Sequence, residues 1–452
     1  MRTGGNVRLA LAACIAALFI LPSIMIGWVS TATAPSLRPL LPTGYALSNL
    51  EAAQKMLRGI GQNDSWFPML NALSAVHSAR DHARLYERVF FEQNIKFQYP
   101  PTSLLPIDFL KRLDLASFGS LNSLNLFVFL ANAAALAWIA AFLFDAKDRQ
   151  GAPSSRDRFV QIGIAGMAFF AAFFFYPLVI AKLFGQIQLW VNLLFTLTVL
   201  SWLLDRRVLA GMLIGLACIL KPQAGIILIW ALAWKEWSVA RGILTTAVPI
   251  LGISLIGYGI HNHFAYLKVL SFLSAHGEAY FANNSVNGLL NRLLGNGEIL
   301  AFQDHSFPPF NPVVYAGTTA FAVAMLVAML APAWRSRRPV AVLDLSVAII
   351  CSVIMSPIAW EHHYGVLPPL YLVAVRAWLD HRGKSAGGSG FALGALTLSW
   401  VLTATFIPLP NLLADTPYNF LQSYMFFGAL ILLGLIFWWR PKVARHPLPL
   451  TA

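Results

Sequence analysis

The sequence predicts an all-α polytopic membrane protein with about twelve membrane segments and long outer loops. Of its 452 residues, 58% are hydrophobic and only 11% are charged, and the mean hydropathy is +0.65. A soluble domain carries about a quarter charged residues, so this composition excludes a soluble enzyme. One bilayer span takes about 20 apolar residues, and we expect residues 1–452 to form a single integral membrane domain.

The net charge of +13 arises from 32 Lys and Arg against 19 Asp and Glu. In a multi-pass protein such an excess collects in short cytoplasmic loops. No DNA- or RNA-binding motif accompanies the charge, so we expect no nucleic-acid partner. The three cysteines, Cys14, Cys218 and Cys351, lie in apolar runs without CxxC spacing. They predict neither a disulfide framework nor a zinc site.

The N-terminal segment combines Arg2 and Arg8 with an apolar run and the triplet Ala-Thr-Ala at 32–34, which together resemble a secretory signal. Pro35 directly follows the would-be cleavage site and disfavours cleavage. We therefore predict an uncleaved first span over about residues 9–30 that leads to the outer face.

Basic clusters mark the inner ends of the later apolar segments, and their alternation predicts that both termini are cytoplasmic. Two runs, 208–220 and 223–234, are too short to cross the bilayer comfortably. They predict a helical hairpin broken at Lys221-Pro222. The other spans are expected over about 121–144, 159–181, 187–204, 242–260, a segment ending at Arg335, 340–358, a segment returning to Arg382, 390–408 and 419–439.

The expected outer regions are residues 31–120, 261–311 and a short motif at 356–364. They contain Tyr, His, Asn, Pro and carboxylates, whereas the short inner loops are merely basic. The two halves of the chain also do not repeat each other, as those of inverted-repeat transporters do. We therefore predict chemistry on the outer face rather than a transport path open to both faces.

Two parts of the first outer loop carry a local signal. Residues 48–59 predict a short amphipathic helix that Ser48 can cap and that would lie at the membrane interface. Further on, Tyr99-Pro100-Pro101 predicts a rigid extended turn. Such a turn serves either the re-entry of the chain into the membrane or the site itself.

Two lysines lie at membrane depth, where a charge is costly and marks function by default. They are Lys182, beside Gly185-Gln186, and Lys221, at the break of the hairpin. An ammonium at such a break is suited to a phosphate, because freed backbone N–H groups add to the attraction. The alternative for each is an interface lysine whose ammonium reaches toward water.

The outer motif 356–364 gathers Glu361, His362 and His363 with aromatic neighbours at the mouth of a span. An adjacent His pair is weak evidence for a metal, since zinc sites prefer spacings such as i, i+4. An interfacial aromatic cluster and a polar substrate or proton-transfer site are the other interpretations. The segment 283–292 offers amides and Arg292, which recognise sugar hydroxyls and phosphate, although its Asn-Asn-Ser is also ordinary loop composition.

Five motifs in this order resemble glycosyltransferase family 87. That family includes polyprenol-phosphate-mannose-dependent α-mannosyltransferases with the GT-C membrane fold. Each motif alone is weak, but five in order over nearly the whole chain are fairly specific. They are Tyr99-Pro100-Pro101, Gly185-Gln186, Lys221-Pro222, Asn283-Asn284-Ser285 with Gly288 and Arg292, and Ser356-Pro357 with Trp360-Glu361-His362-His363.

The resemblance implies a GT-C-like fold and a transferase that moves mannose or another hexose or pentose from a polyprenyl-phosphate donor. A lipid-phosphate sugar carries a good leaving group, so one carboxylate base suffices. Cations must stabilise the departing phosphate, and neither a metal nor another cofactor is expected. We predict that Lys221, Lys182 and Arg292 bind the donor phosphate. The predicted substrate-binding residues are Tyr99, Gln186, Asn284, Trp360, Glu361, His362 and His363.

The base is where this sequence departs from the family pattern. The family places an Asp just after the first span, and counting back from Gly59 puts that position near Tyr45. We assign the base to Glu51, on the predicted amphipathic helix, with Asp81 as the alternative. Asp64, Glu361 and the absence of a base remain open.

We expect the protein in a bacterial inner membrane, with its active site facing the periplasm. The implied partners are the polyprenyl-phosphate sugar, a lipid or glycan acceptor and membrane lipids. A lipid-linked glycan transporter or flippase and a catalytically inactive relative are the alternatives.

Overall fold

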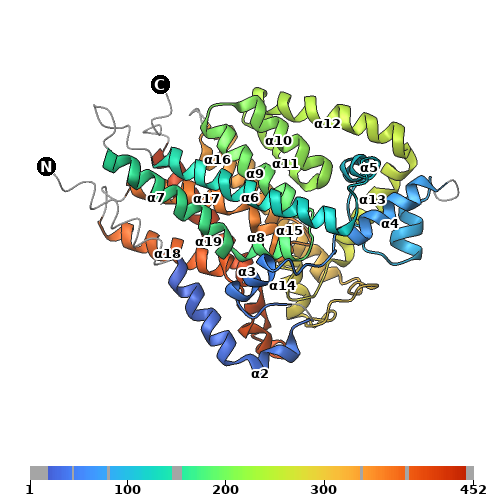
Figure 1. Ribbon diagram of the computed structural model, residues 1–452, viewed down its shortest axis with the longest axis horizontal. Helices are drawn as coiled ribbons and strands as arrows, with labels where there is room; N and C mark the ends of the chain where they lie inside the picture. Colours follow the sequence, from blue (N-terminus) through green and yellow to red (C-terminus); the bar gives the residue numbers. More distant parts are fainter. Residues whose placement is uncertain are drawn as a thin grey trace.

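The computed structural model describes residues 19–42, 45–78, 82–144, 155–335, 340–381 and 386–443. Regular structure in these ranges is helical, apart from one isolated antiparallel bridge between Asn283 and Trp360. Figure 1 shows a bundle in which α4, α5 and α13 lie together at one end, far from α7 and α18. The long helices are α6 (Phe118–Leu143), α7 (Ser155–Ala171), α9 (Gln188–Leu203), α10 (Arg207–Leu220), α12 (Trp237–Tyr258), α13 (Ile260–His276), α15 (Pro312–Arg335), α16 (Val342–Ile354), α17 (Pro368–His381), α18 (Ala386–Ala404) and α19 (Tyr424–Val443).

Four described helices are long and apolar enough to cross a membrane, and up to six spans result if each of two bent pairs counts as one. The four are Phe118–Leu143, Trp237–Tyr258, Pro312–Ala333 and Asn419–Arg440. Shorter apolar helices, among them α9, α10 and α16, accompany them. The polytopic helical class is therefore confirmed, while the number of about twelve segments stays a prediction.

Two expected straight segments are bent. The segment expected over 159–181 divides into helix Arg158–Phe174 and α8 (Tyr176–Leu183), which meet at 55°. Phe175 adopts an extended conformation between them, and Pro177 follows at the start of α8. Proline is favoured in the first turn of a helix and disrupts a helix interior. Pro177 therefore suits the start of α8 and not the middle of one continuous helix. Helix Phe19–Ala32 likewise bends by 78° into the segment Ala34–Leu40, which contains α2 (Ala34–Leu37).

The outer regions are largely helical. The first contains α3 (Asn49–Leu57), α4 (Trp66–His77), a π-helical turn (Glu87–Glu92) and α5 (Leu104–Arg112). The helix expected at 48–59 is confirmed as α3, since the Ser48 hydroxyl accepts a hydrogen bond from the amide of Glu51. The second region holds most of α13 and α14 (Val286–Leu293).

The predicted hairpin break is confirmed. α10 ends at Leu220, and a 3-10 turn (Pro222–Gly225) leads to α11 (Ile226–Ala233). Lys221 between them is extended, with φ −143° and ψ 108°. A proline disfavours the helical conformation for the residue before it, and Lys221 before Pro222 accordingly lies outside the helix.

Candidate active site

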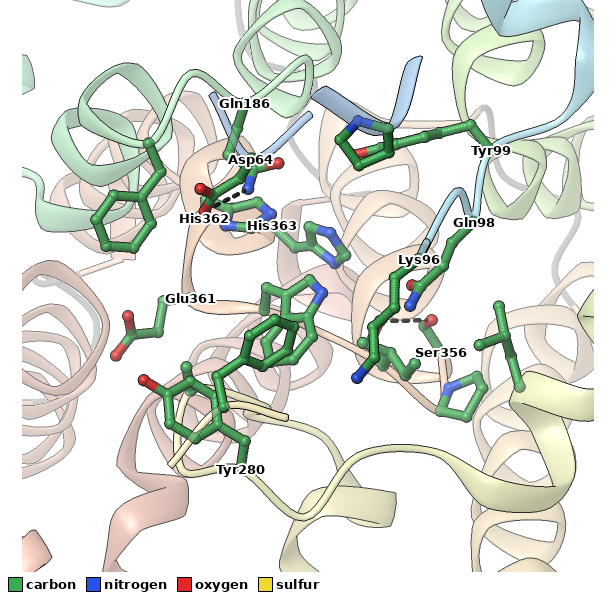
Figure 2. A pocket seen from close by; sticks show the side chains of 18 of the residues that line it. Asp64, Lys96, Gln98, Tyr99, Gln186, Tyr280, Ser356, Glu361, His362 and His363 are labelled. Carbon is green, nitrogen blue, oxygen red and sulfur yellow. Dashed lines mark hydrogen bonds between the residues drawn. The ribbon is translucent and has the colours of Figure 1, made fainter. Parts of the chain in front are cut away.

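A cavity of about 1460 Å³ lies between the hairpin break and the outer loops. Figure 2 shows that its polar side chains come from segments far apart in the sequence. Seven of the predicted site residues line it: Tyr99, Gln186, Lys221, Trp360, Glu361, His362 and His363. Asp64, left open as a base, lines it too, together with Tyr45, Lys96 and Tyr280.

The backbone of residues 62–65 pairs with the end of α8. The amides of Gln62 and Asp64 donate to the carbonyls of Leu183 and Phe184 at 2.8 and 3.0 Å. Gly185 makes this approach possible, because its φ is +62° and a Cβ there would lie 2.2 Å from the Gln62 oxygen. The glycine of the Gly-Gln motif thus accommodates the segment that carries Asp64.

A hydrogen-bonded chain orients the Asp64 carboxylate. The amide of Ile187 donates to Ser65 Oγ at 3.1 Å, and Ser65 Oγ donates to Gln186 Oε1 at 2.7 Å. Gln186 Nε2 is therefore the end that faces Asp64, and it donates to Oδ2 at 3.3 Å (Figure 2). The Tyr99 hydroxyl lies 2.8 Å from Ser65 Oγ. The tyrosine of Tyr-Pro-Pro and the glutamine of Gly-Gln thus belong to one network.

Asp64 is open to the cavity, yet protein surrounds the cavity on most sides. The loss of hydration raises the pKa of Asp64 to about 7, against the opposing effect of the Gln186 hydrogen bond. Asp304 across the cavity raises it further. Such a carboxyl exchanges a proton near neutral pH, as a general base must.

Lys221 forms the cationic part of the cavity. Its Nζ lies 2.6 Å from His363 Nε2 and 5.7 Å from the centre of the Tyr99 ring. Burial and the charge of Lys221 hold the pKa of His363 well below its usual range, so the neutral imidazole accepts a hydrogen bond from the ammonium. An ammonium has three donors, and His363 is its one hydrogen-bond partner among the described side chains. Two donors remain for a ligand.

The Tyr-Pro-Pro turn packs against this break. Thr102 Oγ1 donates at 2.6 Å to the carbonyl of Ile219, near the end of α10. The contact satisfies a carbonyl that the broken helix leaves without an intrahelical donor. It also explains why Tyr99 lies beside Lys221.

Arg292 and Asn284, predicted to bind substrate, are buried and do not line the cavity. The Arg292 guanidinium donates to the carbonyls of Ala279, Tyr280 and Asn283 at 3.1–3.2 Å and to Ser423 Oγ at 2.5 Å. The Asn284 side chain accepts from the amide of Met425 at 3.2 Å. Both residues therefore fix the loop that carries Tyr280.

This loop also fixes the outer motif. The amide of Glu361 donates to the carbonyl of Ala282 at 3.2 Å, and the amide of Asn284 donates to Ala359 at 2.8 Å. Gly288 lets α14 close on the loop, since a Cβ there would lie 2.3 Å from the Asn283 oxygen. Backbone hydrogen bonds therefore hold the Asn-Asn-Ser motif and the Ser-Pro motif together as one structural unit.

Two predicted residues lie elsewhere, and a third is not described. Glu51 bonds Arg38 at 2.8 Å and Lys55 at 3.1 Å and is not part of the cavity lining. These cations and the Leu47 amide lower the pKa of Glu51 despite its partial burial. Lys182 is buried on α8 and does not line the cavity either. Asp81 lies outside the described residues.

Sequence reasoning did not single out Lys96, which faces the cavity beside Tyr99. Its ammonium bonds Glu278 and lies 4.5 and 4.1 Å from the ring centres of Phe302 and Phe307. Glu278 therefore neutralises this second cation. The only signal in the sequence was its place three residues before the Tyr-Pro-Pro turn.

The fold and the cavity define a helical membrane protein in which charged and polar side chains gather in one cavity. The chain belongs to glycosyltransferase family 87, whose sequence profile matches residues 97–357. The matched region begins after Asp64 and ends just before Trp360, so it contains none of the three candidate bases in the first outer loop, Glu51, Asp64 and Asp81.

Two relatives carry a more specific name, "Polyprenol-phosphate-mannose-dependent alpha-(1-2)-phosphatidylinositol pentamannoside mannosyltransferase". The protein from Mycolicibacterium smegmatis is 27% identical over 227 residues, which are 50% of each chain. The one from Mycobacterium tuberculosis is 26% identical over 209 residues, 46% of this chain and 43% of the relative. The chain thus spans about half the length of the relatives it matches.

Proposed function

We propose that this protein transfers a sugar from a polyprenyl-phosphate donor to a lipid or glycan acceptor on the periplasmic face of the inner membrane. The observation that carries the proposal is one cavity lined by a carboxyl with a pKa near 7, Asp64, and a buried ammonium, Lys221. Most of the polar residues that line the cavity belong to the regions that the sequence predicts on the outer face of the membrane. The names of the relatives support the donor class.

In the proposed reaction the acceptor hydroxyl oxygen bonds to the anomeric carbon while the bond from that carbon to the phosphate oxygen breaks. Asp64 takes the hydroxyl proton, and the polyprenyl phosphate leaves with the bonding electrons. Lys221, with two free donors, stabilises the negative charge that grows on the phosphate. This assignment replaces Glu51 as the base.

The apolar wall of the cavity fits the remainder of the donor. Leu220, Ile226 and Ile229, close to Lys221 in the sequence, line it, and so do Leu270 and Leu273 of α13. A polyprenyl chain entering here would bury apolar surface while its phosphate meets the ammonium. The donor phosphate and its tail are thus accommodated next to each other.

The test uses purified protein in lipid nanodiscs with polyprenyl-phosphate-mannose and a mixture of bacterial acceptor lipids. We expect labelled mannose in the acceptor fraction, and we expect its loss in Asp64→Asn. Transfer from a nucleotide sugar, with none from the lipid donor, would overturn the proposal. Movement of the lipid donor between leaflets without transfer would instead support a transporter.

A further inference from the structure

At one end of the cavity a buried carboxyl group lies without a partner. Glu361 is only 2% exposed, and its Oε1 has no hydrogen bond within the described part of the chain. The hydroxyls of Tyr176 and Tyr280 are also buried, and neither makes a hydrogen bond of normal geometry there, although Tyr280 lies within electrostatic range of Tyr45. Figure 2 shows the Glu361 carboxyl beside the Tyr280 hydroxyl, on the far side of the cavity from Lys96 and Tyr99.

Tyrosines, rather than cations, surround this carboxyl. The charge of Glu361 adds to burial in raising the pKa of both Tyr45 and Tyr280. Tyr176 and Tyr424 are also within electrostatic range of Glu361, although no hydrogen bond of normal geometry joins Tyr176 to it. Burial raises the pKa of Glu361 to about 8. At neutral pH the group is an uncharged acid that can both donate and accept.

Buried polar atoms nearly always have hydrogen-bond partners. A buried atom without a partner loses its hydrogen bonds to water and gains none in the protein, which lowers the stability of the fold. Of these three residues, Glu361 and Tyr280 line the cavity, whereas Tyr176 does not. A phosphate is a poor partner for the two, since it would meet an acid and a phenol and no cation. A polyprenyl chain is worse, since it would leave both atoms unpaired. A group with several hydroxyls can satisfy them together.

We propose that Glu361, Tyr45 and Tyr280 form a subsite that binds the hydroxyls of the transferred sugar. This inference rests on the proposed function and divides its cavity into a phosphate end at Lys221 and a sugar end at Glu361. Aromatic rings border the subsite: Trp360 lies 6.2 Å from Tyr280, and Phe184 lies 5.0 Å from Tyr45, between ring centres. Such rings pack against the apolar faces of a sugar ring.

The subsite is built on fixed backbone. Arg292 holds the Tyr280 carbonyl, and the Ala282 carbonyl receives the amide of Glu361. The two segments therefore cannot move apart without breaking buried hydrogen bonds. A rigid set of donors and acceptors lowers the cost of ordering on binding.

The experiment compares two ligands in nanodiscs, polyprenyl phosphate and polyprenyl-phosphate-mannose. The wild-type protein should bind the sugar-bearing lipid more tightly, and the ratio of the two dissociation constants measures the sugar's contribution. Glu361→Leu should reduce this ratio about tenfold, which is about 1.4 kcal/mol, with affinity for polyprenyl phosphate unchanged. Glu361→Gln should keep most of the ratio, because an amide also donates and accepts.

Tyr280→Phe provides a second variant, since it removes one hydroxyl and retains the ring. We expect a smaller reduction of the same ratio, with an unchanged melting temperature. An unchanged ratio in both Glu361→Leu and Tyr280→Phe would overturn the subsite. Equal losses in Glu361→Gln and Glu361→Leu would also overturn it, because an amide that donates and accepts hydrogen bonds would then fail to replace the uncharged acid. Failure of the wild-type protein to bind either lipid would count against the proposed function itself.

Discussion

Gln186 donates a hydrogen bond to the carboxylate of Asp64 at 3.3 Å across 122 residues of sequence. The direction of this bond follows from the backbone, because the amide of Ile187 can only donate to Ser65. Ser65 then donates to the Gln186 oxygen and leaves its NH₂ group for Asp64. The ionised form of Asp64 is the form that this arrangement stabilises.

The first prediction concerns the base. Asp64→Asn should lower turnover by about 10²- to 10⁴-fold at saturating donor, as expected for loss of a general base. Glu51→Gln should stay within a few-fold of wild type, because its exposed ion pairs contribute only ~1 kcal/mol or less to stability. Initial rates of sugar transfer provide the measurement. The opposite ranking of the two variants would return the base to Glu51.

The second prediction concerns pH. A base must be ionised, so turnover should rise with pH through about 7, the pKa of Asp64. Gln186→Met removes a hydrogen bond that favours the ionised form, so the pKa of Asp64 should rise and the acid limb of the profile should move to higher pH. Profiles of kcat for both proteins test this. A profile lowered at every pH without a shift would mean that Gln186 contacts substrate instead.

The third prediction separates the two lysines. Lys221→Met should weaken binding of polyprenyl phosphate about 10- to 100-fold, the value of one or two charge-assisted hydrogen bonds. Lys182→Met removes an equally buried ammonium that does not face the cavity, and it should leave the affinity within a few-fold. Titration of both variants with the lipid distinguishes them. A larger loss of affinity in Lys182→Met than in Lys221→Met would mean that the phosphate binds at Lys182 and not in the cavity.

The fourth prediction concerns Gly185. Gly185→Ala places a methyl group 2.2 Å from the Gln62 carbonyl oxygen in a left-handed conformation, which alone costs ~1–2 kcal/mol. The segment of Asp64 should be displaced, so we expect both a lower melting temperature and lost turnover. Gly252→Ala on α12 meets nothing within 4 Å and is the matched control. Normal turnover in Gly185→Ala would show that the pairing of these segments is dispensable.

The fifth prediction assigns Arg292 to the fold. Arg292→Met leaves several buried carbonyls without a donor, so we expect a stability loss of ~3–5 kcal/mol, typical of breaking a buried charged network. Arg112→Met, which removes an exposed guanidinium, should have little effect. Thermal unfolding in detergent compares them. Full stability with a selective loss of donor affinity would restore the predicted phosphate role of Arg292.

Local sequence features predicted much of this architecture. Hydropathy located α6, Pro222 located the hairpin break, and the motif series named Tyr99, Gln186 and Lys221, all of which the cavity brings together. The proposed base was harder to find, because spacing along the chain led to Glu51, whereas Asp64 reaches the cavity through backbone pairing with α8. The phosphate-binding role predicted for Arg292 also depended on its residue type alone. A guanidinium suits phosphate and carbonyl oxygens equally well, and only the tertiary fold decides between them.

The hydrogen bond between Arg292 and Ser423 also has a consequence for biosynthesis. The Asn419 side chain reaches the Arg292 carbonyl at 2.9 Å, and the Asn284 side chain receives the Met425 amide. The loop that carries Tyr280 thus depends on residues translated more than a hundred positions later. A nascent chain can insert its earlier spans and still lack a finished cavity until α19 enters the membrane. A ribosome-bound intermediate that lacks α19 would therefore be unable to consume donor lipid before assembly is complete.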